Sequence, residues 1–377
     1  MPAPLLLPDT GLDPGWPEYA DSVRAALLGG ALGDALGSLA RSDGRRPPAP
    51  SHGAESPSGR RETGDATTVL RISGSTQLTL YTLDALQEVV EWANQGHAAD
   101  ETACLWLAYL RWLRARGGPH PAEAPRPLPR PIDEQEALHT AREPDDTALE
   151  ALRTGRMGEV ERPLLPEAKG CGTVPRSVPY GLLPHVGWRT LAPLAINGAA
   201  VTHGHPEAQT AAAVQGFVVH AAVRARREGV ERPVAAAVAA ARETAGNLTR
   251  PVAETLERLG DAVRAAEQET LDPEDLTRLL GAGRSAPEAL AIGLCAALAA
   301  EAGDPHGRDP QTVFRRAVAL ATGRDGAAAG AVAGAVTGAA LGTAALPPEW
   351  TARLDARDAV AGTADRWLRE VGAPSAA

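Results

Sequence analysis

The sequence contains few of the residues on which several protein classes depend. Its 377 residues include only three cysteines, Cys104, Cys171 and Cys295, which are too few and too scattered for a disulfide framework or a zinc site. Aromatic residues make up 3% of the chain. This scarcity, together with the abundance of alanine, favours closely packed helices over a β-sandwich.

Basic residues are outnumbered as well. The 37 Lys and Arg residues stand against 47 Asp and Glu residues, and the formal net charge at pH 7 is −10. Phosphate contacts need clustered basic side chains, so this balance argues against general nucleic-acid binding. The first residues show neither a basic leader nor an apolar stretch of signal length. We therefore expect a cytoplasmic protein.

Glycine and alanine dominate residues 326–342. Five glycines recur there at every fourth position and would form one stripe on an α-helix. Each glycine costs about 0.8–1 kcal/mol of helix propensity against alanine, so the stripe costs roughly 4–5 kcal/mol. Only close approach of a neighbouring backbone could offset that cost. We expect the innermost helix here, packed against a second helix with the same spacing at Gly29, Gly33 and Gly37.

Residues 326–346 carry no charge and are long enough to span a bilayer, and small residues at this spacing also occur in membrane helices. Their only strongly apolar side chains are those of Val332, Val336, Leu341 and Leu346. Each contributes only about −0.3 to −0.6 kcal/mol on insertion scales. That is too little to drive insertion, so we expect a buried helix and no membrane interaction.

Helical periodicity covers most of the remaining chain. A first helix is expected over residues 18–37, and a second is expected to begin after a cap in Ser73–Thr76 and run to Asn94. Further helices are expected at about 100–116, 133–155, 206 onward, 232–246, 251–267, 273–281, 286–303, 309–321 and 348–370. No convincing strand alternation appears. The fold class is therefore all-α, with one compact domain over residues 17–370 and Gly-striped helices at its centre.

The other segments read as non-helical. We expect tails at residues 1–16 and 371–377, a mobile loop at 41–66, and a proline-rich connector at 117–132. Residues 163–198 interrupt the helical pattern with repeated proline and glycine. A long irregular stretch inside a helical domain is typical of a functional site.

Three stretches resemble segments of the ADP-ribosylglycohydrolase family. Residues 28–37 resemble the opening helix of that family, and residues 71–80 resemble its Thr-Asp-Asp-Thr-Gln-Met-Thr-Leu segment. Residues 323–334 resemble its Gly-Gly-Asp-Thr-Asp-Thr segment and the helix of small residues that follows. Residues 169–176 and 202–207 lie between them in the family order. Five motifs in order are far more specific than any one of them.

The resemblance implies an all-α domain that binds ADP-ribose-like ligands beside a pair of Mg²⁺ ions. In the family these ions hold the ribose hydroxyls and position the water that cleaves the ADP-ribosyl bond, and their ligands come from the two acidic segments. This sequence departs from that pattern. Ser73, Gly74 and Ser75 stand where Thr, Asp and Asp are expected, and Ala327 and Ala328 stand where the later Asp and Thr are expected.

Of the metal-ligand positions only Asp325 keeps its carboxylate, with Ser73 as a weak hydroxyl substitute. Mg²⁺ demands near-octahedral oxygen ligation, usually with carboxylates, and several carboxylates are needed to offset the repulsion between two such ions. We therefore expect a degraded metal site, with no cofactor or at most one weakly bound Mg²⁺.

Two aspartates are the candidate catalytic residues, Asp34 and Asp325. Asp34 reads equally well as a cap within the glycine-rich helix pair and as a residue of the cleft. The resemblance suggests that the 169–176 loop cradles a phosphate and that His203 contacts the ligand. The candidate ligand-binding residues are Lys169, Gly170, Gly172, Thr173, Arg176 and His203. His203 also has a purely structural interpretation as a hydrogen-bonding residue ahead of a helix.

Three functional hypotheses remain open at this point. In the first, the protein is an ADP-ribosylglycohydrolase-like protein that is impaired or inactive as a dinuclear Mg²⁺ hydrolase and binds ADP-ribose, a related nucleotide or an ADP-ribosylated substrate. In the second, it is an active hydrolase with one metal or none. In the third, it is a structural or interaction protein that kept only the fold.

Overall fold

We describe the protein from a computed structural model, which describes residues 7–43, 68–142, 145–268, 270–304, 309–323 and 326–374. The chain is 66% helical, and the described residues form fifteen α-helices and no strand. Three isolated β-bridges are the only strand-like pairings among them. The predicted all-α class with a single domain is confirmed.

The connections between the helices vary in length, from a few residues, as between α7 and α8, to long segments, as between α3 and α4. The helices up to α7 are α1 (Pro17–Asp43), α2 (Gly74–Asn94), α3 (Glu101–Ala115), α4 (Asp146–Arg153), α5 (Val178–Gly181), α6 (Trp188–Ala200) and α7 (Pro206–Arg227). The remaining helices are α8 (Pro233–Ala245), α9 (Ala253–Ala266), α10 (Pro273–Leu280), α11 (Ala286–Ala302), α12 (Pro310–Ala321), α13 (Ala327–Leu341), α14 (Pro348–Thr351) and α15 (Arg357–Glu370).

The two glycine-striped helices, α1 and α13, pack backbone to backbone at the centre. An ideal Cβ placed on Gly33 would lie 1.9 Å from the carbonyl oxygen of Gly330, and one placed on Gly29 would lie 2.4 Å from that of Gly334. No side chain fits at these contacts, which explains why the sequence accepts the helix-propensity cost of glycine. The predicted central helix pair is confirmed.

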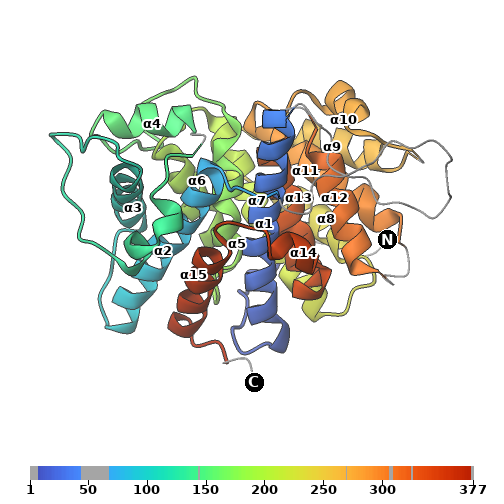
Figure 1. Ribbon diagram of the computed structural model, residues 1–377, viewed down its shortest axis with the longest axis horizontal. Helices are drawn as coiled ribbons and strands as arrows, with labels where there is room; N and C mark the ends of the chain where they lie inside the picture. Colours follow the sequence, from blue (N-terminus) through green and yellow to red (C-terminus); the bar gives the residue numbers. More distant parts are fainter. Residues whose placement is uncertain are drawn as a thin grey trace.

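The other helices flank this pair on two sides. In Figure 1, α2, α3 and α4 lie to the left of α1, and α9, α10, α11 and α12 lie to the right. The chain returns at its end: α15 lies on the side of α2, where the Asn94 amide donates to the Glu370 carboxylate at 2.8 Å.

In the part of the chain that the structure describes, one helix, over residues Pro17–Ala40, is long and apolar enough by length and composition to cross a membrane, and 72% of its most apolar window is buried inside the molecule. The helix of residues Ala327–Leu341 is apolar but shorter.

The structure corrects several predicted boundaries. Residues 133–155 hold two short 3-10 turns and only one helix, α4, because Pro131 and the polar residues after it support single turns rather than a continuous helix. The irregular stretch predicted to reach residue 198 ends at α6, which accommodates Pro193 in its first half. The last predicted helix is two helices, α14 and α15.

The two loop-like predictions near the N-terminus need adjustment as well. Within the predicted tail, residues 7–16 pack on the domain, with Leu12 fully buried and bridged to Pro184. Within the predicted 41–66 loop, α1 continues to Asp43, and residues 44–66 lie outside the described residues.

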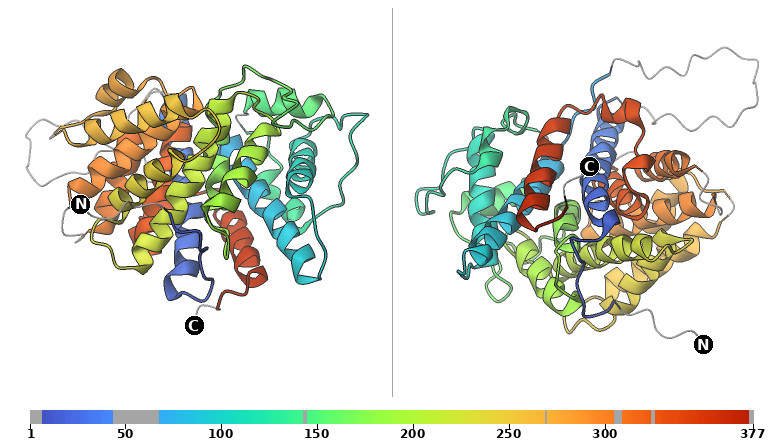
Figure 2. Two further views of the ribbon diagram at one scale, coloured as in Figure 1. Left: turned by 180° about the vertical axis from the view of Figure 1, so that it is seen from behind. Right: turned by 90° about the horizontal axis from the view of Figure 1, so that it is seen from below.

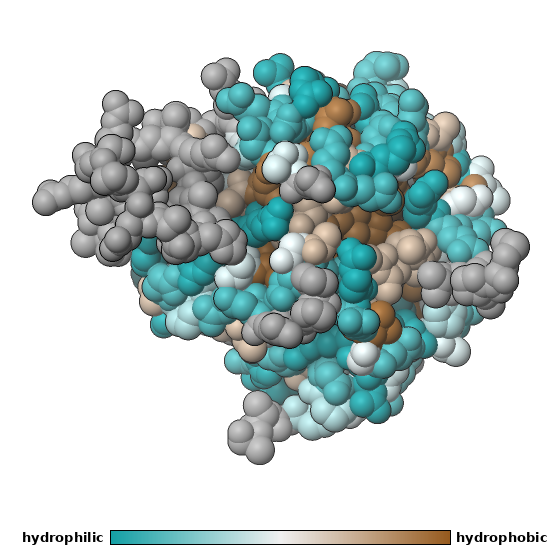
Figure 3. Space-filling view, turned by 90° about the vertical axis from the view of Figure 1, so that its right-hand side faces the viewer, coloured by the Kyte–Doolittle hydropathy of each residue, from teal (hydrophilic) through white to brown (hydrophobic). Residues whose placement is uncertain are grey.

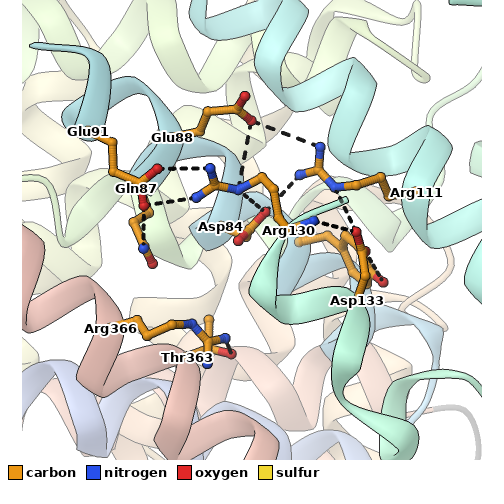
Figure 4. Close-up of polar contacts among 10 residues, drawn as sticks. Asp84, Gln87, Glu88, Glu91, Arg111, Arg130, Asp133, Thr363 and Arg366 are labelled. Atoms are coloured by element: carbon orange, nitrogen blue, oxygen red, sulfur yellow. Dashed lines mark hydrogen bonds and ion pairs between the residues drawn. The ribbon is translucent and has the colours of Figure 1, made fainter. Parts of the chain in front are cut away.

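The proline-rich connector projects beside α3 in both Figure 1 and the left view of Figure 2. It is anchored at its end by Arg130, whose guanidinium lies 2.9 Å from Asp84 and 2.9 Å from Glu91, both on α2 (Figure 4). Arg111 on α3 pairs with the same Asp84 carboxylate at 2.7 Å. This buried ion-pair cluster fixes the connector to α2 and α3.

The surface is not uniformly polar. The face on the right-hand side of Figure 1 carries a hollow in which hydrophobic residues gather inside a rim of hydrophilic ones (Figure 3). Single exposed apolar residues are ordinary, but this grouping shows that the helices on this side are not fully covered.

Candidate functional site

The residues expected at a metal site lie where the N-terminal ends of α2 and α13 meet α1. Gly30 on α1, Thr76 on α2 and Ala331 on α13 line one small cavity. An ideal Cβ on Gly37 would lie 2.6 Å from the Cα atom of Ala327. The structure therefore brings the three family segments together, as their order in the sequence suggested.

Asp34 is the carboxylate at this junction, and it is fully buried. Its Oδ2 accepts hydrogen bonds from the Ser73 backbone N–H at 2.8 Å and from the Thr76 hydroxyl at 2.5 Å. Its Oδ1 accepts from the Ser73 hydroxyl at 2.6 Å. Burial raises the pKa of the Asp34 carboxyl, while the hydrogen bonds from Ser73 and Thr76 oppose that shift. These contacts tie α1 to the start of α2, rather than capping within the glycine-rich helix pair as one interpretation of Asp34 expected.

The Ser73 hydroxyl, expected as a weak metal ligand, is engaged on both sides. It donates to Asp34 and accepts from the Ser75 backbone N–H at 3.0 Å, which makes Ser73 the N-cap of α2. At the start of α13, Ala327 and Ala328 present only methyl groups. Asp325 lies outside the described residues.

These residues do not fit a dinuclear magnesium site. Across the described ranges, no group of three or more His, Cys, Asp or Glu side chains is arranged to hold a metal ion. The one buried carboxylate at the junction, that of Asp34, already accepts three hydrogen bonds. No chemical step through a metal pair can be assigned to the described residues.

The 169–176 loop forms a second group of candidate residues. It consists of two 3-10 turns, and it is tied to the start of α11 by hydrogen bonds from Cys171 N to Arg284 O and from Ala286 N to Lys169 O. The Thr173 hydroxyl donates to the carbonyl of Ala208 on α7 at 3.0 Å. The loop is thus held between α7 and α11.

Both cationic side chains of this loop have protein partners. Lys169 pairs with Glu254 at 2.9 Å, and both side chains are about one-third exposed. Arg176 is 1% exposed, donates to the Thr202 hydroxyl at 2.5 Å, and stacks on the ring of Tyr109 with its Cζ 5.1 Å from the ring centroid. The lysine alone lies where it could meet a ligand from solvent.

His203 lies beneath the loop and is fully buried. Its Nδ1 is 2.8 Å from the Thr202 hydroxyl, and its Nε2 faces the Asp145 carboxylate at 3.9 Å. Burial lowers the pKa of His203 to about 4, a shift that Asp145 opposes and Arg176 reinforces. His203 is therefore neutral at physiological pH.

The two glycines of the loop face these side chains. An ideal Cβ on Gly170 would lie 3.3 Å from His203 Nε2, and one on Gly172 would lie 1.8 Å from Asp145 Oδ2. Gly172 is thus required where the Asp145 carboxylate approaches the loop backbone.

Sequence reasoning missed Asp145. Its only local signal is its place ahead of a short helix, and its Oδ1 does accept from Ala148 N at 3.1 Å as the N-cap of α4. Its contact with His203 joins residues 58 positions apart, which no local pattern reveals.

A separate cavity of about 450 Å³ lies between α6 and the segment that follows α8. Trp188 and Ala192 line it from α6, and Asn247 and Arg250 line it from the other side. It contains none of the residues predicted from the sequence. Arg250 nevertheless reaches the loop region, because it donates to Gln209, whose amide donates to the His203 carbonyl.

Comparisons with known proteins identify the family. One similar solved structure, an ADP-ribosylglycohydrolase-related protein complex, aligns with a TM-score of 0.53 and 22% sequence identity, over 94% of this chain and 99% of that chain. At that identity the likeness shows the fold alone. The comparison with curated proteins finds no match. The family model for ADP-ribosylglycohydrolase matches residues 16–376, so this chain belongs to the ADP-ribosylglycohydrolase family, as its motifs indicated.

Proposed function

We propose that this protein binds ADP-ribose or a related nucleotide and is impaired or inactive as a dinuclear magnesium hydrolase. The observation that carries the proposal is the state of Asp34, whose carboxylate is buried and accepts three hydrogen bonds from the first turn of α2. A carboxylate used in this way stabilises a helix end, and its three donors occupy most of the lone-pair sites with which it would bind a cation.

The surrounding substitutions support the same conclusion. Gly74 and Ser75 on α2 and Ala327 on α13 replace the carboxylates with which the family binds its metal pair. Of the family's ligand carboxylates only that of Asp325 remains, and one aspartate cannot offset the repulsion between two Mg²⁺ ions roughly 4 Å apart. Loss of the metal pair removes the groups that position the attacking water.

The loop side of the site supports retained ligand binding. The 169–176 loop keeps its glycines, its fixed attachment to α7 and α11, and a partly exposed lysine. Backbone N–H groups of such loops form anion-binding concavities. ADP-ribose combines a diphosphate with ribose hydroxyls, and both suit a site of this composition.

Isothermal titration calorimetry with ADP-ribose, with and without excess Mg²⁺, tests the proposal together with an assay for release of ADP-ribose from an ADP-ribosylated protein. We expect binding whose affinity does not depend on Mg²⁺, and no release. Robust Mg²⁺-dependent turnover would overturn the proposed loss of activity. Absence of any nucleotide affinity would overturn the binding part and favour a purely structural protein.

The Asp325→Asn variant separates the remaining alternative, a hydrolase that works with one metal ion. If Asp325 holds such an ion, the variant loses release activity that the unmodified protein shows. Under our proposal both proteins show no release and bind ADP-ribose equally well.

A further inference from the structure

Three buried side chains beside the 169–176 loop each carry a polar atom that has no hydrogen-bond partner among the described residues. These atoms are Asp145 Oδ2, His203 Nε2 and Arg176 Nη1. The side chains are 9%, 0% and about 1% exposed, respectively. Buried polar groups are nearly always hydrogen-bonded, and leaving one unpaired costs about 1–3 kcal/mol. Asp145 and Arg176 both lie close enough to act on the charge of His203, so the three atoms form one cluster whose hydrogen bonds a polar group from outside the chain would complete.

The hydrogen bonds around Thr202 determine which ring nitrogen of His203 carries the proton. Arg176 can only donate, so the Thr202 oxygen accepts from it. Among the described residues, the only acceptor within reach of the Thr202 hydroxyl proton is His203 Nδ1, at 2.8 Å. His203 Nδ1 is then an acceptor, and the neutral ring carries its proton on Nε2.

The Nε2–H of His203 therefore points toward a carboxylate oxygen that it cannot reach. The distance of 3.9 Å between Nε2 and Asp145 Oδ2 is too long for a hydrogen bond. An oxygen atom placed about 2.8 Å from both atoms would accept from His203 and donate to Asp145. An alcohol hydroxyl or a water molecule is the group that can do both with one atom.

We propose that Asp145 and His203 form a hydroxyl-binding pair, which holds one ribose hydroxyl of the ligand and a water molecule when no ligand is bound. This inference rests on the proposed binding of ADP-ribose. A phosphate does not suit the same place, because it would carry negative charge against the Asp145 carboxylate. A metal cation does not suit it either, because Arg176 lies in the same cluster and only one carboxylate faces the gap.

The glycines of the loop make the pair possible. A side chain on Gly172 would displace the Asp145 carboxylate, and one on Gly170 would crowd His203 Nε2. The loop therefore contributes by leaving space for the two polar atoms as well as by its backbone N–H groups. The pair differs from the cap of α2, where the Ser73 hydroxyl both donates and accepts within the chain.

A crystal structure of the protein without nucleotide tests the pair directly. We expect an ordered oxygen 2.6–3.1 Å from both Asp145 Oδ2 and His203 Nε2. A direct hydrogen bond between the two side chains, with no oxygen between them, would overturn the inference. This test stays decisive even if the protein proves to bind no nucleotide, so the two proposals can fail separately.

The Asp145→Asn variant tests the pair in solution. Asparagine is a good N-cap, so α4 is retained, but its amide group replaces an acceptor with a donor. We expect the Kd for ADP-ribose to rise roughly 10- to 100-fold, as for loss of a hydrogen bond to a charged group. If the carboxylate only repelled the diphosphate, the Kd would fall instead, and that result would overturn the pair.

Two controls accompany this measurement. Inorganic pyrophosphate lacks hydroxyl groups on carbon, so its affinity should not fall in Asp145→Asn; an equal loss for both ligands would contradict the pair. The Asp358→Asn variant removes a carboxylate that is exposed on α15 and pairs only with Arg357. It should bind ADP-ribose as the unmodified protein does.

Discussion

The two groups of candidate residues differ in how completely their polar atoms are satisfied. At the junction of α1, α2 and α13, the Asp34 carboxylate accepts three hydrogen bonds, and Ser73 both donates and accepts. Beside the 169–176 loop, Asp145 Oδ2 and His203 Nε2 are equally buried and have no partner among the described residues. Satisfied groups hold the fold, whereas unsatisfied ones are available to a ligand.

Packing follows the same division. Glycines at the metal-site junction bring two helix backbones together, as at Gly33 and Gly330, where no side chain fits between them. The glycines of the loop, Gly170 and Gly172, instead face polar side-chain atoms. Glycine therefore permits backbone contact between helices in one group and leaves room beside polar side-chain atoms in the other.

The largest expected effect tests the backbone contact between α1 and α13. Gly33→Ala places a methyl group 1.9 Å from the Gly330 carbonyl oxygen, and neither backbone can move without shifting a whole helix. We expect a loss of about 3 kcal/mol or more in the free energy of unfolding, measured by urea denaturation.

The matched control is Gly362→Ala on α15, where the nearest atom to the new methyl group is the end of the Arg366 side chain at 3.7 Å. This variant should gain up to about 1 kcal/mol from helix propensity. Equal effects of the two substitutions would contradict the backbone contact between α1 and α13.

A second prediction concerns the pH dependence of stability that arises from His203, beside the 169–176 loop. The pKa of His203 is about 4 in the folded protein, below the ordinary value of 6.5. Between these values the unfolded chain binds a proton that the folded protein does not, so stability falls as the pH drops from about 6.5 to 4. The shift corresponds to at most about 3 kcal/mol.

His203→Gln should remove this part of the pH dependence. His220 is also buried, and its pKa is lowered to about 3, so the unmodified protein carries two such contributions and the variant carries one. Urea denaturation at pH 7 and pH 4.5 measures the difference. An unchanged pH dependence in the variant would show that His203 titrates normally and is not buried as described.

A third prediction asks whether restored carboxylates allow the junction of α1, α2 and α13 to bind Mg²⁺. The triple variant Gly74→Asp, Ser75→Asp and Ala327→Asp restores carboxylates at the family positions, and acidic residues in the first turn of a helix are favourable. We expect Mg²⁺ affinity at least about tenfold above that of the unmodified protein, measured by calorimetry. No gain would mean that the junction has closed beyond the loss of its ligands.

The sequence predicted those features that depend on local pattern. The spacing of Gly29, Gly33 and Gly37 against the stripe of α13 identified the central helix pair, because only backbone contact can compensate for so many glycines in a helix. A cap for α2 within Ser73–Thr76 and Pro206 in the first turn of α7 were predictable for similar reasons.

Features that depend on distant contacts were not predictable. The sequence of residues 133–155 has helical periodicity, but the described residues form two single 3-10 turns and one longer helix, α4. Tertiary packing, which the local pattern does not show, determines where these turns form. The start of α6 was hidden by Gly187 and Pro193, which read as loop residues. The meeting of Asp145 with His203, and the engagement of Arg176 by Thr202, exist only in the folded chain.

The smallest expected effect concerns Lys169, the partly exposed cation of the 169–176 loop. Its ammonium group is neutralised by Glu254 on α9 in a partly exposed pair, which contributes at most about 1 kcal/mol to stability. Glu254→Gln removes the competing carboxylate and leaves the lysine free to meet a diphosphate. We expect ADP-ribose to bind about two- to fivefold more tightly, with stronger dependence on salt, because the gain is electrostatic. The double variant Glu254→Gln with Lys169→Gln should lose this gain, whereas a gain that persists without the lysine would assign it to reduced general repulsion and leave the loop without a working cation.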